Sequence, residues 1–271
     1  MDILERILNE KRKRLRNLEK QTPLSELKRQ LKDKVPAICP EKQGLTPNSF
    51  HVIAEIKRAS PSQGIIPWRL SLEETLQAYE SGGASLISIL TEENFFFGGP
   101  ADFQKIRSLT SLPLLRKDFI FSEYQVIESS VMGADIILLI AGILDAAALP
   151  NLLHLTHELG LNALVECRDE RDISQALKAG AKIIGINNRD LRTFRINLER
   201  TQTLSPLIPP NCILVSESGI HTPEDAAFVS KHGAQAVLVG ESCLLSPDPV
   251  LHIRSLREAG LGAKEVKTCP G

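Results

Sequence analysis

One pattern recurs along most of this chain: a Gly-Ala pair followed by a short apolar run. Its four copies begin at Gly83, Gly133, Gly180 and Gly233, about fifty residues apart. In each copy a stretch of helical periodicity ends at the glycine, which suits the C-cap of a helix, and the apolar run after it predicts a strand buried on both faces. The repeat therefore predicts helices that alternate with parallel strands.

Further apolar runs lie between these copies and ahead of the first. With them the sequence predicts eight strands, at 52–57, 86–90, 112–117, 136–140, 161–166, 183–186, 212–217 and 236–239. Eight strands that alternate with helices match an α/β fold of the (β/α)8 TIM barrel type in count and total length. An open doubly wound sheet is the alternative, but it more often has fewer strands and a Gly-x-Gly-x-x-Gly turn, which is absent here.

The N-terminal part lies outside this repeat. Residues 1 to about 30 have apolar positions at helical spacing and predict one amphipathic helix. Its basic run at 11–14 is diluted by glutamates, so we expect a solvated face rather than a nucleic-acid site. The stretch 35–49 holds three prolines and predicts a linker. The expected divisions are an N-terminal helical extension with its linker (1–48), the catalytic barrel (49–260) and a C-terminal tail (261–271).

Composition narrows the class of partner. The net charge of -1 over 271 residues lacks the basic excess of nucleic-acid binders, so a small molecule is favoured. The longest apolar run, 136–144, is too short to cross a bilayer, and the N-terminus carries no targeting pattern. Five scattered cysteines fit a reduced cytoplasmic protein, and His154 and His157 alone are weak metal ligands. We expect a cytoplasmic monomer without a metal.

Polar residues gather where the predicted strands end, and barrel enzymes work at those ends. The ends carry Glu55, Lys57, Lys117, Asp118, Glu166, Asn187, Asn188, Arg189, Glu217, Ser218, Gly240 and Glu241. Glu55 and Lys57 project to one face of their strand, either as a structural ion pair or as part of a site. Five ionisable groups on four strand ends favour an acid–base site, with the 136–140 strand as an apolar wall.

Small-residue loops indicate where an anion would bind. The loop 58–64, the Ser-Gly pair at 218–219 and the loop at 240–242 offer hydroxyls and backbone donors. A helix should start at Thr222, with a threonine cap and a proline in its first turn. These features predict a phosphate site, although simple tight turns would also explain the glycines. Phenylalanines at 95–97 and 119 predict an apolar pocket at the other end, or else a local core under a loop.

Five blocks at or beside these strands together carry a resemblance to a known family. They are residues 53–62, 90–92 with 96–99, 113–119, 185–190 and 215–219. In this order they resemble the blocks of the indole-3-glycerol-phosphate synthase family of tryptophan biosynthesis, and the resemblance covers essentially the whole chain. It implies that the N-terminal helix lies over the barrel mouth.

The resemblance implies a carboxy-lyase that needs no metal or organic cofactor. Its substrate would be 1-(2-carboxyphenylamino)-1-deoxyribulose 5-phosphate, cyclised to indole-3-glycerol phosphate with loss of CO2 and water. Lys117 resembles the general acid that protonates the ribulose carbonyl oxygen, and Glu166 the base of the later dehydration. Lys57 resembles the residue that faces the anthranilate carboxylate. The residues that resemble the polar shell around them are Glu55, Asn187 and Glu217. We expect Lys117 to lie near Lys57, where crowding of cations would ease proton release.

The resemblance also implies a set of substrate-binding residues. They are Arg58, Ser60, Phe96, Phe119, Arg189, Leu191, Ser218, Gly219, Gly240 and Glu241. Many relatives have a serine where this chain has Glu241, and an acidic side chain would repel a phosphate. Only the backbone N–H of Glu241 is therefore a credible phosphate donor.

Two other functions stay open on the residues alone. One is another phosphosugar barrel enzyme, either the isomerase of the preceding step or an aldolase that uses Lys117 or Lys57 as a Schiff-base nucleophile. The other is a non-catalytic barrel that binds a ligand or a partner. A binding protein need not keep five ionisable groups at its strand ends, which favours an enzyme.

Overall fold

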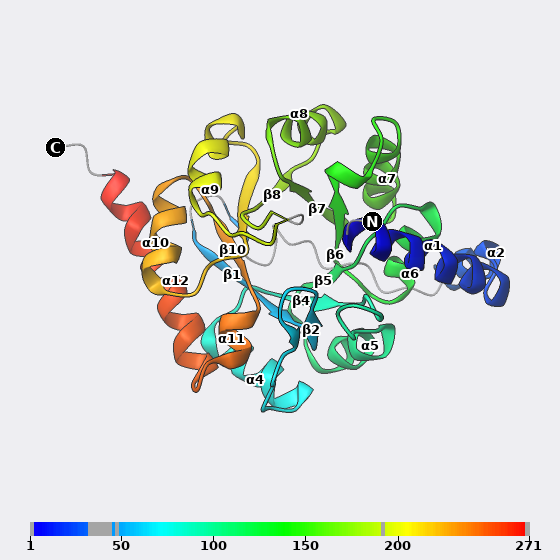
Figure 1. Cartoon of the computed structure of the whole chain (residues 1–271), viewed down its shortest axis with the longest axis horizontal. Coiled ribbons are helices and arrows are strands. Elements are labelled where there is room, and N and C mark those ends of the chain that lie inside the picture. Colours follow the sequence, from blue (N-terminus) through cyan, green and yellow to red (C-terminus); the bar gives the residue numbers. More distant parts are fainter. Residues whose placement is uncertain (1–2, 32–44, 47–48, 191–192, 269–271) are drawn as a thin grey trace.

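The computed structural model describes residues 3–31, 45–46, 49–190 and 193–268. Its centre is a closed barrel of parallel strands surrounded by helices (Figure 1). The barrel strands are β1 (His51–Ile56), β4 (Leu86–Leu90), β5 (Leu114–Lys117), β6 (Ile136–Ile140), β7 (Asn162–Cys167), β8 (Ile183–Asn187), β9 (Ile213–Glu217) and β10 (Ala236–Val239). They pair in the order β1-β10-β9-β8-β7-β6-β5-β4, and β4 closes onto β1. The predicted (β/α)8 barrel is confirmed.

Helices connect the strands and form the outer ring. They are α4 (Leu72–Gly82), α5 (Pro100–Leu109), α6 (Glu123–Val131), α7 (Ala148–Glu158), α8 (Glu170–Ala179), α9 (Glu199–Leu204), α10 (Pro223–Lys231), α11 (Glu241–Leu245) and α12 (Pro249–Thr268). Short elements complete the connections: β2 (Ala59–Ser60), β3 (Gly64–Ile65), η2 (Ala141–Ile143) and η3 (Ser205–Leu207). Gly83 ends α4 with φ 85° and Gly180 ends α8 with φ 90°, as the repeat predicted, because glycine tolerates this left-handed conformation.

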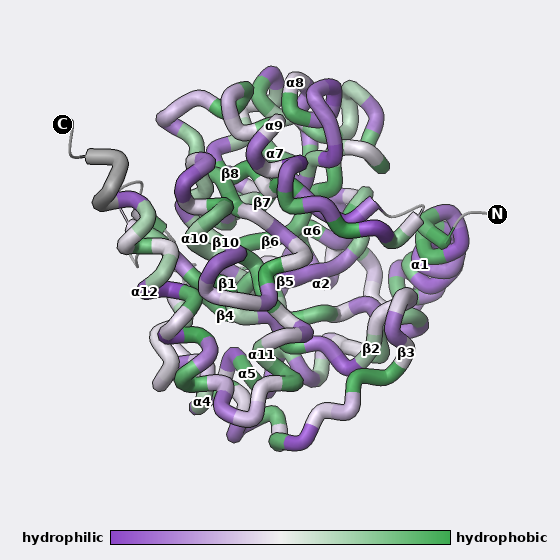
Figure 2. The backbone as a smooth tube through the Cα atoms, turned by 60° about the vertical axis from the view of Figure 1, so that its left-hand side comes forward, coloured by the Kyte–Doolittle hydropathy of each residue, from purple (hydrophilic) through white to green (hydrophobic). Residues whose placement is uncertain are grey.

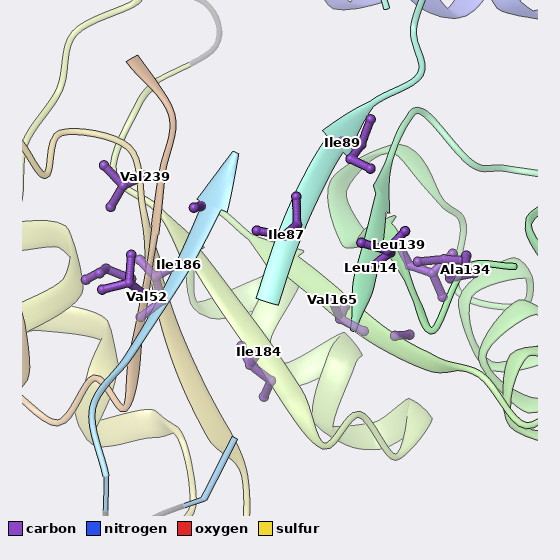
Figure 3. Packing of buried hydrophobic residues seen from close by; sticks show 14 of the residues in the cluster. Val52, Ile87, Ile89, Leu114, Ala134, Leu139, Val165, Ile184, Ile186 and Val239 are labelled. Atoms are coloured by element: carbon purple, nitrogen blue, oxygen red, sulfur yellow. The ribbon is translucent and has the colours of Figure 1, made fainter. Parts of the chain in front are cut away.

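The barrel strands bury both of their faces. Outward-facing side chains such as Val52, Leu114 and Leu139 pack beneath the helices, as Figure 3 shows. Inward-facing side chains such as Ile53 and Leu115 form a second cluster inside the barrel. Figure 2 shows apolar segments along the central strands and polar segments over much of the outside. Burial on both faces explains why each strand is an unbroken apolar run in the sequence.

The N-terminal extension contains α1 (Ile3–Gln21) and α2 (Leu24–Gln30), where the sequence predicted a single helix. Pro23 separates them, since proline disfavours a helical conformation at the residue before it. Leu15 and Leu27 pack with Tyr124 and Ile127 of α6. In Figure 1 the extension, in dark blue, lies on the side of the barrel that carries β5, β6 and α6. Most of the predicted linker falls outside the described residues, so the domain boundary there stays a prediction.

The basic run at 11–14 is not simply the solvated face that the sequence predicted. Lys11 is 8% exposed, and its ammonium lies 2.7 Å from the carboxylate of Asp118 just beyond β5. Lys13 does face solvent and pairs with Glu10 on the same helix at 2.8 Å. Four consecutive residues of a helix point in directions that go most of the way around it. At least one of the four charges must therefore face the surface on which the helix packs.

Some possible features are absent from the described ranges. No helix within them is both long enough and apolar enough to span a membrane. The same residues contain no group of three or more His, Cys, Asp or Glu side chains that could hold a metal ion. His154 is exposed, and its ring lies 3.3 Å from Glu158 one turn further along α7.

Candidate active site

A cavity opens at the carboxyl ends of the barrel strands, on the side where the sequence predicted the chemistry. Leu138 and Ile140 of β6 form the expected apolar wall. The predicted site residues that line the cavity are Glu55, Lys57, Ser60, Phe96, Lys117, Phe119, Glu166, Asn187, Arg189, Glu217, Ser218, Gly219, Gly240 and Glu241. The topology explains this convergence, because parallel strands in a closed barrel all end on one rim.

Lys117 sits between two carboxylates. Its Nζ donates to Glu217 Oε2 at 2.7 Å and to Glu166 Oε2 at 3.1 Å. Asn187 Nδ2 donates to the other oxygen of Glu166 at 3.1 Å and fixes that carboxylate. Arg116, the preceding residue of β5, points the opposite way and donates to Glu128 of α6 at 2.7 Å. An amide, an ammonium and two carboxylates thus form one hydrogen-bonded group inside the barrel.

The charges around Lys117 differ from those that the sequence predicted, and they change the expected pKa of this lysine. Burial alone would lower the pKa of its ammonium, but the charges of Glu217, Glu166 and Glu55 outweigh burial and raise this pKa well above its ordinary value. The prediction that crowding by cations eases proton release was therefore wrong. The sequence could not show it, because the two contacting carboxylates come from distant strands. The lysine therefore stays protonated at neutral pH, and it can release a proton only where its ion pairs are weakened.

Glu217 has an unusual environment for a carboxylate. Burial raises its pKa to about 7, although the nearby Lys117 ammonium opposes the rise and Glu166 adds to it. Its Oε1 finds no hydrogen-bond partner among the described residues. A Cβ atom at Gly185 of β8 would collide with this oxygen, so glycine makes the room for it. Glu217 therefore titrates in the neutral range, and its unpaired oxygen packs against the backbone of β8 and not toward the open cavity.

Glu55 and Lys57 form an ion pair within the cavity wall. Lys57 Nζ lies 2.9 Å from Glu55 Oε1, so the ion pair is present and both of its members line the cavity, while its role in a site stays a prediction. Gly240, at the end of β10, packs directly against it. A Cβ there would come within 2.7 Å of Glu55 Oε1 and 3.2 Å of Lys57 Nζ. Gly240 thus leaves space for the pair, in addition to any role as a turn.

The loop after β9 has the geometry expected of an anion site. Ser218 and Gly219 both have left-handed backbone, with φ 68° and 84°, which is uncommon for serine. The predicted start of α10 follows: Thr222 Oγ1 accepts from the N–H of Asp225 at 3.2 Å, and Pro223 occupies the first turn. The positive end of α10 and the exposed turn ahead of it favour a bound anion.

The apolar end of the cavity holds an aromatic pair. The rings of Phe96 and Phe119 lie 6.3 Å apart at an angle of 41°. They come from the loops after β4 and β5, and both line the cavity. Leu191, which the resemblance places beside them, lies outside the described residues.

Arg58 does not join the site. Its guanidinium binds Asp102 of α5 through two bonds of 2.9 and 3.0 Å and lies 5.5 Å from the centre of the Trp68 ring. We therefore leave it out of the substrate-binding set. Arg189 does line the cavity, and its Nη1 donates to Ser62 Oγ at 3.4 Å.

Sequence reasoning missed part of the cavity wall. The family resemblance placed the N-terminal helix over the barrel mouth, but helical spacing did not show which of its residues face the cavity, and nothing marked Phe194 or His221 as ligands. The additional lining residues are Ile3, Leu4, Ile7, Phe194 and His221, besides Ser242 of the predicted 240–242 loop.

Comparison with known proteins connects this barrel and its rim residues to one family. A family model described as indole-3-glycerol phosphate synthase matches residues 4–256. The chain belongs to the indole-3-glycerol phosphate synthase family. The match begins within α1, so the N-terminal helix is part of the family's conserved extent and not an appendage of this chain.

Curated members of the indole-3-glycerol phosphate synthase family match nearly the full length. The protein of that name from Carboxydothermus hydrogenoformans is 40% identical over 253 residues, which cover 91% of this chain and 96% of the relative. The one from Chlorobium phaeobacteroides is 45% identical over 251 residues, covering 92% and 96%. The family suggested by the five sequence blocks is confirmed.

Solved structures that resemble this family member show the fold alone. The 3-hexulose-6-phosphate synthase from Salmonella typhimurium superposes with a TM-score of 0.63 at 15% identity, covering 79% of this chain and all (100%) of that chain. The thiamine phosphate pyrophosphorylase from Pyrococcus furiosus gives 0.61 at 16%, covering 80% and 98%.

Proposed function

We propose that this chain catalyses the synthesis of indole-3-glycerol phosphate from 1-(2-carboxyphenylamino)-1-deoxyribulose 5-phosphate, as an enzyme of tryptophan biosynthesis. The observation that carries the proposal is the position of Lys117 between Glu166 and Glu217 in a cavity with an anion-binding loop at one end and an aromatic pair at the other. A substrate with a phosphate and an anthranilate ring has the same two ends. Family membership supports the same reaction.

The first step is ring closure, in which a carbon of the aromatic ring attacks the ketone. Negative charge develops on the ketone oxygen, and we assign the Lys117 ammonium to protonate it. Loss of CO2 then restores the aromatic ring. Lys57, paired with Glu55 at 2.9 Å in the free protein, would exchange that partner for the substrate's carboxylate. In both steps the acting group is a lysine ammonium that carboxylates of the cavity pair with in the free protein.

The second step is dehydration: a C–H beside the former ketone carbon loses its proton to a base, and the new hydroxyl takes a proton from the Lys117–Glu217 pair and leaves as water. We assign Glu166 as the base, held by Asn187 at 3.1 Å. Lys117 contacts the same carboxylate at 3.1 Å, so a proton taken up by Glu166 can return to the lysine. Glu217 completes the group, and its pKa of about 7 lets it share that proton.

The aldolase alternative is weakened by the charge on Lys117. A Schiff base needs a neutral amine, and the surrounding carboxylates raise the pKa of this lysine well above its ordinary value. Borohydride treatment in the presence of substrate would trap a Schiff base, and we expect no trapped adduct.

The proposed reaction is tested by incubating the purified protein with the carboxyphenylamino substrate. We expect indole fluorescence to appear and CO2 to be released in equal amounts. Substrate that stays intact at high protein concentration would contradict the proposed function and favour a binding protein or another phosphosugar enzyme.

The acidic residue at the phosphate end supplies a second prediction. Glu241 lines the cavity beside the proposed phosphate site, so its charge should weaken binding of the substrate. Replacing it by serine should lower KM roughly two- to fivefold with little change in kcat, and added salt should shrink the difference. Glu170→Ser, a change to an exposed acid in the first turn of α8, is the matched control. An unchanged KM for Glu241→Ser would place the phosphate elsewhere.

We also propose that the enzyme works as a cytoplasmic monomer. The side chains assigned above line one cavity within a single barrel, which is compatible with a monomer. Light scattering at assay concentration would measure a mass near 29.9 kDa for a monomer. A larger mass would contradict this part of the proposal without affecting the assigned chemistry.

A further inference from the structure

Four basic side chains of α1 contact the two loops that carry the aromatic pair. Two of them reach the loop after β4, which holds Phe96. The Arg6 guanidinium lies 5.8 Å from the centre of the Phe95 ring, and Arg14 forms an ion pair with Glu93. Arg6 and Arg14 lie about two turns apart on the same side of α1, so the helix rests on this loop through charged side chains as well as its apolar face.

The other two basic side chains reach the loop after β5, which holds Phe119. Lys11 Nζ lies 2.7 Å from Asp118, and the Arg12 guanidinium lies 5.6 Å from the centre of the Phe121 ring. The contacted residues therefore flank Phe119 on either side in sequence. One helix thus spans both loops between which the Phe96–Phe119 pair is formed.

Asp118 is the centre of these contacts. It is 1% exposed, and besides Lys11 it accepts from Thr91 Oγ1 at 2.8 Å and from Arg116 at 3.2 Å. Its Oδ1 also accepts from the backbone N–H of Phe119 at 2.8 Å. Burial would raise the pKa of this carboxyl, but the Lys11 and Arg116 charges lower it to about 2. A charged, fully paired carboxylate therefore joins α1 to the backbone of the aromatic residue.

The same helix contributes to the cavity itself. Ile3, Leu4 and Ile7 line it from above, one to two turns ahead of Lys11. Ile7 is 3% exposed, so its side chain is buried where it lines the cavity. The position of this apolar wall depends on how firmly α1 is held at Lys11.

We propose that Lys11 is a positioning residue for the aromatic half of the substrate. Its buried ion pair with Asp118 fixes α1 across the loops after β4 and β5, and so sets the spacing between Phe96, Phe119 and the apolar wall of α1. The inference rests on the proposed function, because it concerns the anthranilate end of that substrate. It assigns Lys11 no contact with reacting atoms.

Lys11→Met is the direct test, because methionine keeps the length and apolar stem of lysine and removes its charge. We expect KM for the substrate to rise roughly tenfold while kcat stays within about twofold, since binding geometry is lost and the Lys117 group is kept. Inhibition by inorganic phosphate, which probes only the other end of the cavity, should be unchanged. Lys11→Arg should restore most of the affinity.

Lys13→Met is the matched control, because Lys13 lies on the same helix but faces solvent and pairs only with Glu10. It should behave as wild type in every assay. A wild-type KM for Lys11→Met would overturn the inference. An equal rise in KM and in the phosphate inhibition constant would also overturn it, because that result indicates general loosening of the barrel mouth.

A second variant keeps the test decisive if Lys11→Met fails to fold. Arg12→Met removes the stacking contact on Phe121 and an exposed hydrogen bond to Asn9 Oδ1, and it leaves no buried charge without a partner. It should raise KM a few-fold and leave phosphate inhibition unchanged, whereas a wild-type KM would count against the inference. Failure of the proposed function looks different: the wild-type protein itself would form no indole product.

Discussion

Replacement of Lys117 by methionine should lower kcat by about 10²–10⁴ while KM changes far less. Methionine keeps the length of the side chain and removes the proton that we assign to the ketone oxygen. The two carboxylates that hold the lysine at 2.7 and 3.1 Å lose their cation, and the cavity loses its acid, while the groups assigned to the two ends of the substrate are unchanged. Steady-state kinetics with the carboxyphenylamino substrate measure both constants.

Lys57→Met is the comparison for this experiment. Its proposed partner is a carboxylate that the substrate carries from the start, so its loss should raise KM more than it lowers kcat. The thermal unfolding of both variants should be measured alongside the kinetics, because removal of Lys117 leaves two buried carboxylates without their cation and can lower stability. A Lys117→Met enzyme that keeps more than about a tenth of wild-type kcat would contradict the assignment and make Lys57 the candidate acid.

Replacement of Glu166 by glutamine should also lower kcat by about 10²–10⁴, because an amide cannot take the proton released in the dehydration. Glutamine has nearly the same shape, and its carbonyl oxygen can still accept from Lys117 or from Asn187, although its NH2 group cannot accept from the other. If ring closure is left intact, the reaction should stop between the steps and release CO2 without a matching yield of indole. Comparison of CO2 release with fluorescence measures this difference.

Glu217→Gln is the matched variant, since Glu217 contacts the same lysine. The pKa of Glu217 is raised to about 7, so as the pH falls through this value the carboxylate gains a proton and its ion pair with Lys117 weakens. We expect kcat/KM of the wild type to fall on the acid side of neutrality, and this acid limb to vanish in Glu217→Gln. An acid limb that persists in Glu217→Gln and vanishes in Glu166→Gln would exchange the two roles.

The fold could be predicted from the sequence because its signals are local. A glycine that ends a helix and the apolar run that follows it are neighbours in the chain. Four copies of this helix–strand unit are compatible with few fold architectures. The rim was predictable for the same reason: once the strands are placed, Glu55, Lys117 and Glu166 must lie at their carboxyl ends.

What could not be predicted depends on contacts between distant segments. The charge state of Lys117 is set by strands 49 and 100 residues further along the chain. Lys11 looked like one of four similar basic residues, and only its contact with Asp118 across 107 residues distinguishes it. Arg58 follows a site residue in sequence, yet it turns to Asp102 because a strand end directs successive side chains to different sides.

Strand β5 ends in two adjacent cations whose side chains lie on opposite sides of the barrel wall. Arg116 contacts α6, and Lys117 projects into the cavity. Only odd or even position decides which is which, since strand side chains alternate. A one-residue slip would deliver to the cavity a guanidinium, which does not release a proton in proteins, and would leave the ammonium against α6. The register of β5 thus determines which cation enters the cavity. An insertion near this strand is tolerated only where the flanking loops accommodate it without shifting the register.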